Sequence, residues 1–392
     1  MSRILTINGG SSSIRFALFD VDGSNKRLLD GKVERIGTPA AALTLRPAGQ
    51  PPSEVKIQAD KPESAVDALV SRLKQQWPDT AVQGIGHRVV HGLKHMDPEP
   101  VTPQLLEELK RLEPYDPEHL PREIELIEIL QQRYPQAQQA VCFDTAFHRN
   151  LPQVARQLPI PRKYFDRGVQ RYGFHGLSYT FLLAQLQRLG DPAATRGRVI
   201  LAHLGNGASM AAVRDGQGID TSMAFTPTAG LVMSSRTGDL DPGVISYLLR
   251  TEHLSAEQLQ RIVNHESGLV GVSGSSGDVR DLLKREDADA RAREALDLFC
   301  YQAKKWIGSF TAVLGGLDTL VFAGGIGENS APIRARICAG LEYLGVAVDP
   351  SRNAKHDAVI SLPGAPVTLR VIPTDEESVI ASATAQVLSL NS

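Results

Sequence analysis

Cysteine, long apolar runs and net charge are all scarce in this sequence. The three cysteines, Cys142, Cys300 and Cys338, lie far apart without Cys-x-x-Cys spacing, which favours free thiols in a reducing compartment over a disulfide scaffold. No apolar run is long enough to cross a bilayer, and no apolar segment with a cleavage site follows the N-terminus. A net charge of -2 and a pI near 6.6 give no electrostatic case for nucleic acid or an anionic membrane surface. We therefore expect a soluble cytoplasmic protein with small-molecule ligands and neither nucleic-acid nor membrane partners.

Two similar stretches half a chain apart suggest a duplication, and 392 residues are enough for two domains. The stretches are Arg3 to Asp20, RILTINGGSSSIRFALFD, and Arg198 to Asp215, RVILAHLGNGASMAAVRD. Each is expected to form two strands joined by a turn of Gly, Asn and Ser, which brings backbone N–H groups and hydroxyls to an anion. Two ordinary hairpins are the alternative, but the repetition favours a duplicated nucleotide-binding scaffold. No GxxxxGK[ST] sequence occurs, which counts against a P-loop enzyme.

An arginine lies within a predicted buried strand, GIGHRVVHG at 84–92. Alternation along this strand places His87 and His91 on one face and Arg88 and Val90 on the other. A cation beside an apolar side chain suits a short carboxylate with a hydrocarbon tail. A metal site at His87 and His91 would instead need a helix and a third ligand.

Acidic residues follow two other predicted strands. Asp144 ends the strand in AVCFDTAFH at 140–148, and Glu376 and Glu377 follow the strand at 367–372. Ligands collect at the carboxyl ends of strands in α/β sheets, so Asp144 is a candidate for organising magnesium or water. The alternatives are that Asp144 caps the next turn and that the glutamates favour the N-terminus of the last helix.

Polar clusters in segments without periodicity give further candidates. His175, in the Gly-bounded turn RYGFHG at 171–176, is poorly explained by packing alone. The long segment at 220–243 ends in SSRTGDLDPG, where Arg236, Asp239 and Asp241 are candidates because long structureless segments in compact domains are often functional. Its apolar residues argue against disorder.

The other expected elements alternate helices with glycine-rich or proline-rich connections. A strand at 319–323 leads into the turn GGIGENS at 324–330 and a helix at 331–344, an arrangement that places a helix N-terminus at a nucleotide. A Gly/Ser loop is expected at 267–281, and Pro-rich chain at 151–167 is expected to cross between domains. Further helices are expected at 62–77, 103–112, 121–133, 242–250, 256–264 and 288–314, and from the acidic turn to about 388.

Motifs spread over the whole chain carry a family resemblance. They are, in order, INGGSSSIRF, GHRVVHG, FDTAFH, RYGFHG, HLGNGAS, DTSMAFTPTAGLVMSSRTGDLDPG, SGLVGVSG, GGIGENS and PTDEE. In this order and at these separations they closely resemble the acetate kinase family, from residue 3 to about residue 385. The resemblance implies an α/β fold of duplicated actin-like (ribonuclease H-like) domains around a central nucleotide cleft. It implies an N-terminal domain of residues 1–148 plus 378–392, a C-terminal nucleotide-binding domain of residues 149–377, and a homodimer.

The resemblance also implies roles for individual residues. The implied catalytic residues are Arg88, Asp144, His175 and Arg236. The implied residues for binding ATP or ADP and its phosphates are Asn8, Ser11, Ser12, Arg15, His203, Gly205, Asn206, Gly207, Asp278, Val279, Arg280, Gly324, Gly325, Ile326, Gly327, Glu328 and Asn329. The implied substrate pocket is formed by Arg88, Val90, Phe174 and Pro227. Asn8 and Glu376 are the implied positions for Mg²⁺, with Mn²⁺ as an alternative.

The implied reaction is a reversible in-line transfer of the γ-phosphoryl group from ATP to acetate, giving acetyl phosphate and ADP. A short carboxylic acid is already ionised at neutral pH, so catalysis reduces to alignment and charge neutralisation, without a general base. A propionate or butyrate kinase would share every motif, since an apolar pocket discriminates one methylene by only about 1 to 3 kcal/mol. A non-kinase nucleotide-dependent binding protein is a more remote alternative, but it would not need Arg88, His175 and Arg236 together.

This sequence departs from the family pattern at several positions. LEPYDPEHLP at 112–121 stands where the family has LAPLHNPxN, with Tyr115 or Asp116 in place of a histidine. Arg15 stands where lysine is usual, Leu93 replaces a glycine, and Tyr179 replaces the histidine of GxSH. The loop difference bears on which acid is preferred and on the rate.

Overall fold

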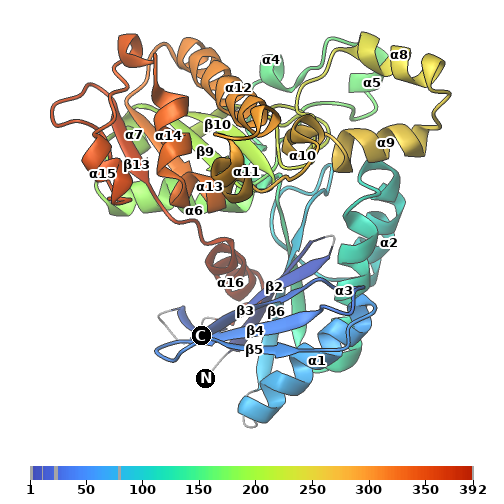
Figure 1. Ribbon diagram of the computed structural model, residues 1–392. Helices are drawn as coiled ribbons and strands as arrows, with labels where there is room; N and C mark the ends of the chain where they lie inside the picture. The colour runs from blue at the N-terminus through green and yellow to red at the C-terminus, as the bar shows by residue number, and fades with distance from the viewer. Residues whose placement is uncertain (1–2, 11, 22–24, 78–80, 391–392) are drawn as a thin grey trace. The chain divides into compact units, whose positions relative to one another are not determined.

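The computed structural model describes residues 3–10, 12–21, 25–77 and 81–390. The chain divides into two compact units (Figure 1): unit 1 comprises residues 1–146 and 375–392, and unit 2 comprises residues 147–374. The family resemblance placed the boundaries after residue 148 and before residue 378, and that domain assignment stays a prediction. One predicted site residue, Ser11, lies outside the described residues.

Unit 1 is built on a mixed sheet whose strand order, within the described residues, is β5-β4-β3-β2-β1-β6-β8-β7. The β1–β2 hairpin is antiparallel, whereas β6 runs parallel to β1 and β8 runs parallel to β6. The strands are β1 (Arg3–Gly9), β2 (Ser13–Asp20), β3 (Lys26–Glu34), β4 (Ala42–Pro47), β5 (Ser53–Lys56), β6 (Val82–Val89), β7 (Glu99–Pro100) and β8 (Gln138–Phe143).

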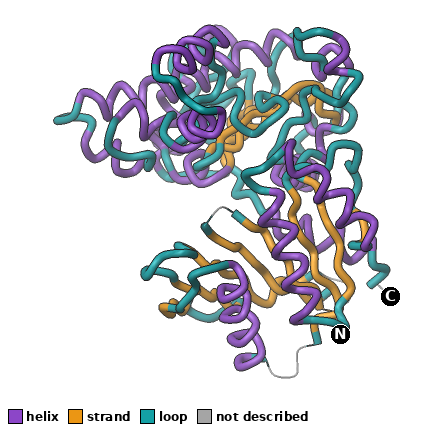
Figure 2. Tube along the Cα trace, turned by 90° about the vertical axis from the view of Figure 1, so that its right-hand side faces the viewer, coloured by secondary structure: helices purple, strands orange, loops and turns teal. Residues whose placement is uncertain are grey.

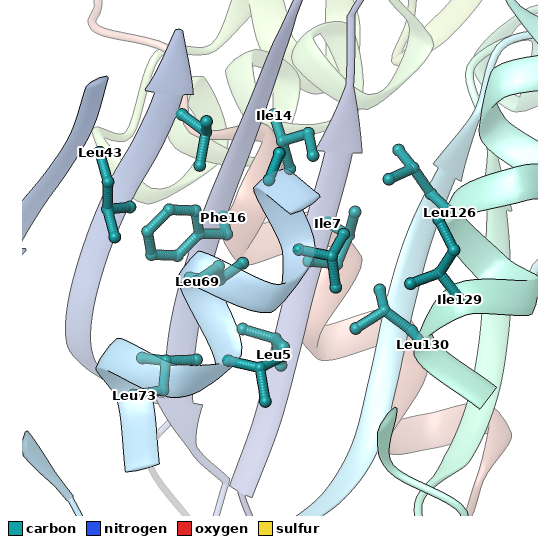
Figure 3. Close-up of a cluster of buried hydrophobic side chains, with 14 of the residues drawn as sticks. Leu5, Ile7, Ile14, Phe16, Leu43, Leu69, Leu73, Leu126, Ile129 and Leu130 are labelled. Carbon is teal, nitrogen blue, oxygen red and sulfur yellow. The ribbon is translucent and has the colours of Figure 1, made fainter. Parts of the chain in front are cut away.

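Helices cover both faces of this sheet, and Figure 2 shows them in purple beside the orange strands. Leu5 and Ile7 of β1 pack in one core with α1 and α3 (Figure 3), whereas Ile4 packs with Ala381 and Ala385 of α16. Because both faces are buried, β1 is a continuous apolar run rather than an alternating one. The helices of unit 1 are α1 (Pro62–Gln76), α2 (Pro103–Leu112), η1 (Glu113–Tyr115), α3 (Leu120–Arg133) and α16 (Glu376–Val387), and η2 (Ala146–His148) spans the boundary with unit 2.

Unit 2 contains a five-stranded sheet in the order β11-β10-β9-β12-β13. Tyr179 and Leu182 of α6 pack in one core with Val199 and Leu201 of β9 and with Val321 of β12. The strands are β9 (Arg198–Leu204), β10 (Ala208–Arg214), β11 (Gln217–Thr221), β12 (Thr319–Ala323) and β13 (Thr368–Val371). The helices are α4 (Gln153–Arg156), α5 (Arg162–Phe165), α6 (Gly176–Arg188), α7 (Ala193–Arg196), α8 (Pro242–Thr251), α9 (Ala256–His265), α10 (Gly268–Ser273), α11 (Val279–Arg285), α12 (Ala290–Leu314), α13 (Gly324–Asn329), α14 (Ala331–Cys338), η3 (Glu342–Leu344) and α15 (Pro350–Ala354).

The two sheets repeat one topology. The order β3-β2-β1-β6-β8 in unit 1 matches β11-β10-β9-β12-β13 in unit 2. In each run the first three strands are antiparallel neighbours and the last three are parallel neighbours. The duplication predicted from the two hairpins is therefore confirmed, and the fold is α/β.

Several glycine-rich segments are helical where turns or loops were predicted. GGIGENS does not form a turn, because Gly324, at φ 75°, lets the chain enter α13 directly after β12. The predicted loop at 267–281 contains α10, which is bounded by Gly268 and Gly274, both at positive φ. The helix predicted at 331–344 ends at Cys338 and is followed by η3.

The segment at 151–167 was wrongly predicted to cross between domains. It lies wholly within unit 2 and contains the one-turn helices α4 and α5. Strand β3 and helix α6 were not predicted at all, since neither shows a clean period in the sequence.

The three cysteines, Cys142, Cys300 and Cys338, are buried free thiols, as predicted. Burial raises the pKa of each to about 12, so all three remain protonated and unreactive at neutral pH. In the described part of the chain, no helix is long and apolar enough to cross a membrane.

Candidate active site

In unit 1, the carboxyl ends of β1, β6 and β8 bring together predicted site residues that are far apart in sequence. Arg88 is the penultimate residue of β6, and Asp144 directly follows β8. Arg88 Nη2 donates to Asp144 Oδ2 at 2.8 Å, and Arg88 Nη1 lies 3.4 Å from Asn8 Oδ1. Asn8 Nδ2 in turn donates to Glu376 Oε2 at 2.9 Å. Parallel pairing of the three strands produces this cluster, because their carboxyl ends meet at one edge of the sheet.

Burial makes the charges in this cluster depend on each other. The Asp144 side chain is fully buried, and that of Arg88 is 15% exposed. Burial alone would lower the pKa of Arg88, but the carboxylates of Asp144 and Glu376 outweigh it and raise that pKa. Burial raises the pKa of Glu376, whereas Arg88 opposes the rise. The Arg88 guanidinium is therefore positively charged, and it is oriented by the oxygen atoms of Asp144 and Asn8.

Two of the residues predicted to bind ATP or ADP, Ser12 and Arg15, lie on or beside β2. Arg15 is exposed and pairs in register with Asn8 across the β1–β2 hairpin. Its charge also acts to lower the pKa of Glu376 and Glu377. Ser12 is exposed, and its carbonyl accepts from Ile36 N at 3.0 Å. The hairpin thus presents a second cation near the Arg88 cluster within unit 1.

In unit 2, two predicted histidines are stacked. His175 lies at φ 58° immediately before α6, and its ring packs on that of His203 with centroids 4.2 Å apart and planes 21° apart. His175 Nδ1 hydrogen-bonds Ser209 Oγ at 2.8 Å, and His203 Nδ1 hydrogen-bonds Ser178 Oγ at 2.9 Å. Each imidazole is therefore held at Nδ1 by a serine hydroxyl.

The loop of Gly205, Asn206 and Gly207 joins β9 to β10 at the Nε2 atoms of His175 and His203. A Cβ built on Gly207 would lie 3.3 Å from His175 Nε2 and 3.7 Å from Arg236 Nη1. A Cβ built on Gly205 would lie 3.7 Å from His203 Nε2 and 3.8 Å from Gly325 N. Because glycine has no side chain, both positions leave room for an anion between the loop backbone and the nitrogen atoms of His175, His203 and Arg236.

Arg236 reaches this loop because the long segment after β11 folds back on it. Ser234 N donates to the Asn206 carbonyl at 3.1 Å, and Arg236 Nη1 donates to the Pro227 carbonyl at 3.1 Å. The other two candidates of the segment bond backbone amides instead. Asp239 Oδ1 accepts from Gly230 N, and Asp241 caps α8.

The remaining residues predicted to bind ATP or ADP lie at the start of α11 and throughout α13. Gly324 N and Thr374 N both donate to Glu328 Oε1, at 2.8 and 3.1 Å, and Asn329 Nδ2 donates to the Gly325 carbonyl. Ile326 is half-buried and Gly327 is buried. Asp278 caps α11 by accepting from Arg280 N at 2.8 Å, and Val279 is buried beneath this cap. The guanidinium of Arg280 holds the pKa of Asp278 below its usual range.

Comparison with known proteins identifies the family of this chain. Residues 3–382 match the model of the acetokinase family. The chain is 42% identical to an acetate kinase of Bacillus cytotoxicus over 97% of its own length and 98% of that protein. The chain belongs to the acetokinase family. It also superposes on the crystal structures of Porphyromonas gingivalis acetate kinase (TM-score 0.87, 34% identity, 99% of this chain and 100% of that one) and of a Francisella tularensis propionate kinase (TM-score 0.91, 33% identity, 98% and 100%). Its fold is therefore the actin-like fold of these kinases.

This acetokinase-family chain has a buried carboxylate that sequence reasoning missed. Glu123 of α3 is 3% exposed, and its Oε2 accepts from Val90 N at 2.9 Å. Burial raises the pKa of Glu123 to about 8, and Arg88 opposes the rise. Its spacing from the buried Leu120 and Ile127 places it on the apolar face of the helix, which is the signal that could have found it.

The segment that departs most from the acetokinase pattern lies beside Glu123. Asp116, which is 4% exposed, pairs with His119 Nδ1 at 2.8 Å. Burial lowers the pKa of His91 to about 4 while the Asp116 charge opposes the change, so His91 is neutral at pH 7. Leu93 lies at φ 49°, in the left-handed region that favours glycine. Burial also lowers the pKa of His87 to about 4, and the Nε2 atom of His87 hydrogen-bonds Gln139 Oε1. Among the described residues, no cluster of three or more His, Cys, Asp or Glu is suited to a metal.

Three apolar residues were predicted to line a substrate pocket, which stays a prediction, and one buried arginine was not predicted. Val90 and Phe174 are buried, and Pro227 is half-buried. Arg334 is fully buried and donates to the carbonyls of Gly327 and Glu328 at the end of α13. Its cation therefore stabilises the carboxyl end of that helix.

Proposed function

We propose that this protein transfers the γ-phosphoryl group of ATP to acetate, reversibly, giving acetyl phosphate and ADP. Family membership over the whole chain supports this reaction class. The observation that carries the proposal is the Arg88 cluster: a half-buried guanidinium, fixed by Asp144 and Asn8, with the buried apolar Val90 two residues on.

In the proposed reaction, Arg88 binds the acetate carboxylate and Val90 contacts the methyl group. Acetate is ionised at neutral pH, so the nucleophilic oxygen needs no base. Asp144 holds the guanidinium through Nη2, which fixes its plane before the substrate arrives. Arginine suits this role because its planar fork matches carboxylate geometry. Orientation of the carboxylate is then the main contribution of unit 1.

The proposed role of unit 2 is to neutralise the transferring phosphoryl group. Backbone N–H groups of the loop at 205–207, His175 Nε2 and Arg236 Nη1 provide donors around one glycine. Preorganised donors of this kind stabilise charge that develops in a transition state. An arginine on a transferring phosphoryl group contributes roughly 10³ to 10⁵ in rate in GTPases.

We propose that magnesium, or manganese in its place, binds at Glu376 and Asn8. Both cations prefer oxygen ligands, and Mg²⁺ is usually held by one or two carboxylates plus substrate phosphates. A carboxylate has two oxygens, so Glu376 can bind an ion with one while the other accepts from Asn8. The bound ion would neutralise charge on the phosphate oxygens.

We also propose a cytoplasmic homodimer. Helices α8 and α9 are amphipathic, yet neither contains a buried residue. Val244 and Tyr247 of α8 are 38% and 58% exposed. Because the family resemblance implies a homodimer, a second copy of the chain is proposed to bind this surface. A cytoplasmic setting fits the buried free thiols and the requirement for ATP.

A propionate or butyrate kinase remains the second candidate, because the Francisella tularensis propionate kinase superposes as well as the acetate kinase does. Hydroxylamine trapping of the acyl phosphate, with ATP, Mg²⁺ and each acid in turn, separates these activities. We expect the highest initial rate with acetate. A higher rate with propionate or butyrate would reassign the substrate, and ATP hydrolysis without hydroxamate from any acid would instead favour a nucleotide-dependent binding protein.

A further inference from the structure

Behind His175 lie two buried hydroxyl groups that the proposed reaction does not use. Ser209 Oγ hydrogen-bonds both His175 Nδ1, at 2.8 Å, and the phenol oxygen of Tyr179. Ser209 and Tyr179 are both fully buried. Tyr179 lies one helical turn after His175 on α6, and its ring packs against Phe147 and His148 with centroids 5.6 and 5.7 Å away. The three polar groups therefore form a chain, Tyr179–Ser209–His175.

The direction of the hydrogen bonds follows from the proton count. Each hydroxyl carries one proton, and a phenol, with a pKa near 10, is a better donor than an aliphatic alcohol. The atomic positions alone fit either direction, and the relative acidity assigns Tyr179 as the donor to Ser209 Oγ and Ser209 as the donor to His175 Nδ1. An imidazole that accepts at Nδ1 carries its proton at Nε2 when it is neutral. That nitrogen faces Gly207, where Arg236 Nη1 also lies.

We propose that Tyr179 and Ser209 are positioning residues that fix His175 in its Nε2–H tautomer, so that Nε2 donates to the transferring phosphoryl group. This inference rests on the proposed function, in which that group lies at the 205–207 loop. The opposite tautomer would direct a lone pair at an anion and repel it. The relay thus supplies an N–H donor beside the cationic Arg236.

The stacked His203 provides an internal contrast. Its Nδ1 is also held by a serine hydroxyl, but Ser178 has as its other partner Thr374 Oγ1, at 2.8 Å. Two aliphatic hydroxyls are of similar acidity, so neither is forced to donate. The phenol therefore imposes a direction on the hydrogen bonds of His175 that the Ser178 network does not impose on His203.

Kinetics of conservative variants test the relay. Tyr179→Phe keeps the ring and removes the hydroxyl, and we expect kcat to fall roughly tenfold while the KM for acetate stays within about twofold. Ser209→Ala removes the group on Nδ1, and we expect kcat to fall roughly 10- to 100-fold. Because both changes break one chain, the double variant should be no slower than Ser209→Ala. Tyr172→Phe, which removes a buried phenol bonded to the Gly168 carbonyl, is the matched control and should leave kcat unchanged.

The tautomer itself is a second readout that does not depend on turnover. Nitrogen-15 chemical shifts of labelled histidine distinguish protonated from unprotonated ring nitrogens, and a His175→Asn variant assigns the signals. We expect Nε2-protonated His175 in the wild type and a mixture of tautomers in Tyr179→Phe. An unchanged tautomer in Tyr179→Phe, Nδ1 protonation in the wild type, or additive losses of kcat would each overturn the relay. If the wild type forms no acyl phosphate, the proposed function fails, while the chemical shifts still decide whether the relay exists.

Discussion

At the scale of single residues, a few buried charges determine what the site can bind. Arg88 and Asp144 form an ion pair with side chains 15% and 0% exposed, so each charge depends on the other for its solvation. Removal of one partner of such a pair is far more costly than the net value of the pair, because the remaining charge is left buried. The same guanidinium is proposed to bind the substrate, so activity and stability should change together at this position.

Replacing Arg88 by alanine should therefore have two effects. Turnover should fall by roughly 10³-fold or more, since the substrate carboxylate loses its counter-charge. The free energy of unfolding should fall by about 3 to 5 kcal/mol, because Asp144 stays buried without a cation. Steady-state kinetics and urea denaturation measure the two effects.

The pair of Arg370 and Asp191 is the matched control, with side chains 16% and 4% exposed and an N–O distance of 2.7 Å. Arg370→Ala should lose similar stability and keep its kcat. Equal loss of kcat in both variants would show that Arg88 acts only through stability.

Glu123 makes stability depend on pH in a direction that can be worked out. Its folded pKa, about 8, lies above the ordinary value of 4.5, so the folded state holds a proton that the unfolded state releases between these values. Stability should therefore fall as the pH rises from about 5 to about 8. Glu123→Gln keeps an acceptor for Val90 N and cannot ionise. Urea denaturation measures the free energy of unfolding of the variant minus that of the wild type. This difference should be larger at pH 8.5 than at pH 5 by at least about 1 kcal/mol, because one pKa unit corresponds to 1.36 kcal/mol.

Glu128, a glutamate on the same helix whose side chain is 42% exposed and pairs with Lys110, is the control for this experiment. Glu128→Gln should change the stability by the same amount at both pH values. If Glu123→Gln also shows no dependence on pH, Glu123 is ionised in the folded protein and the account of its burial is wrong.

At the scale of elements, backbone geometry creates the phosphate site. The β9–β10 turn leaves two glycines facing His175, His203 and Arg236, and α13 starts beside it because Gly324 turns the chain sharply. A Cβ on Gly324 would lie 2.7 Å from the carbonyl oxygen of Leu204, so no other residue fits there without a shift of the backbone. The proposed anion-binding loop thus depends on glycines that let backbone segments pack closely, rather than on long side chains.

Gly207→Ala tests this directly. Its Cβ would occupy space 3.3 Å from His175 Nε2, so we expect the KM for ATP to rise or kcat to fall by at least about tenfold, with a small change in stability. Gly308→Ala is the matched control: it lies within α12 with nothing within 4 Å of the added Cβ, and it should stabilise the helix by roughly 0.5 to 1 kcal/mol without kinetic effect. Unchanged kinetics in Gly207→Ala would show that the loop does not bind the phosphate groups.

Periodicity and turn chemistry made some elements predictable and left others hidden. Both hairpins were predicted because two apolar runs flank a Gly/Asn/Ser turn, and the amphipathic helices were predicted from their spacing. The helix α13 was predicted as a turn because its glycines have low helical propensity, and tertiary contacts with β9 override that preference. Asp144 could be singled out by its place after a strand and Arg88 by its place beside Val90, whereas Asn8 was identified only through the family resemblance. The role of Ser209 could not be predicted, and Tyr179 was noted only as a departure from the family pattern, because their role depends on contact between α6 and β10.

At the scale of the whole molecule, two copies of one strand topology carry different chemistry. Unit 1 presents arginines and carboxylates at its strand ends, whereas unit 2 presents glycines, histidines and one arginine. A duplicated fold therefore does not imply duplicated sites, since function depends on the residues at each strand end.

The apolar surface of α8 leads to a prediction about assembly. Tyr247→Glu places a charge on a side chain that is 58% exposed, and it should shift the protein from dimer to monomer in light scattering coupled to gel filtration. Tyr343→Glu, at a side chain that is 77% exposed, is the control and should leave the dimer intact. A dimer that survives Tyr247→Glu would place the interface elsewhere.

The most direct test of the central claim is phosphorus-31 NMR of the purified protein with ATP, Mg²⁺ and acetate. We predict that acetyl phosphate and ADP appear in equal amounts, that ATP re-forms when acetyl phosphate and ADP are supplied, and that Arg236→Ala loses both directions by roughly 10³-fold. Inorganic phosphate and ADP without acetyl phosphate would contradict the assignment of this chain as an acetate-phosphorylating enzyme.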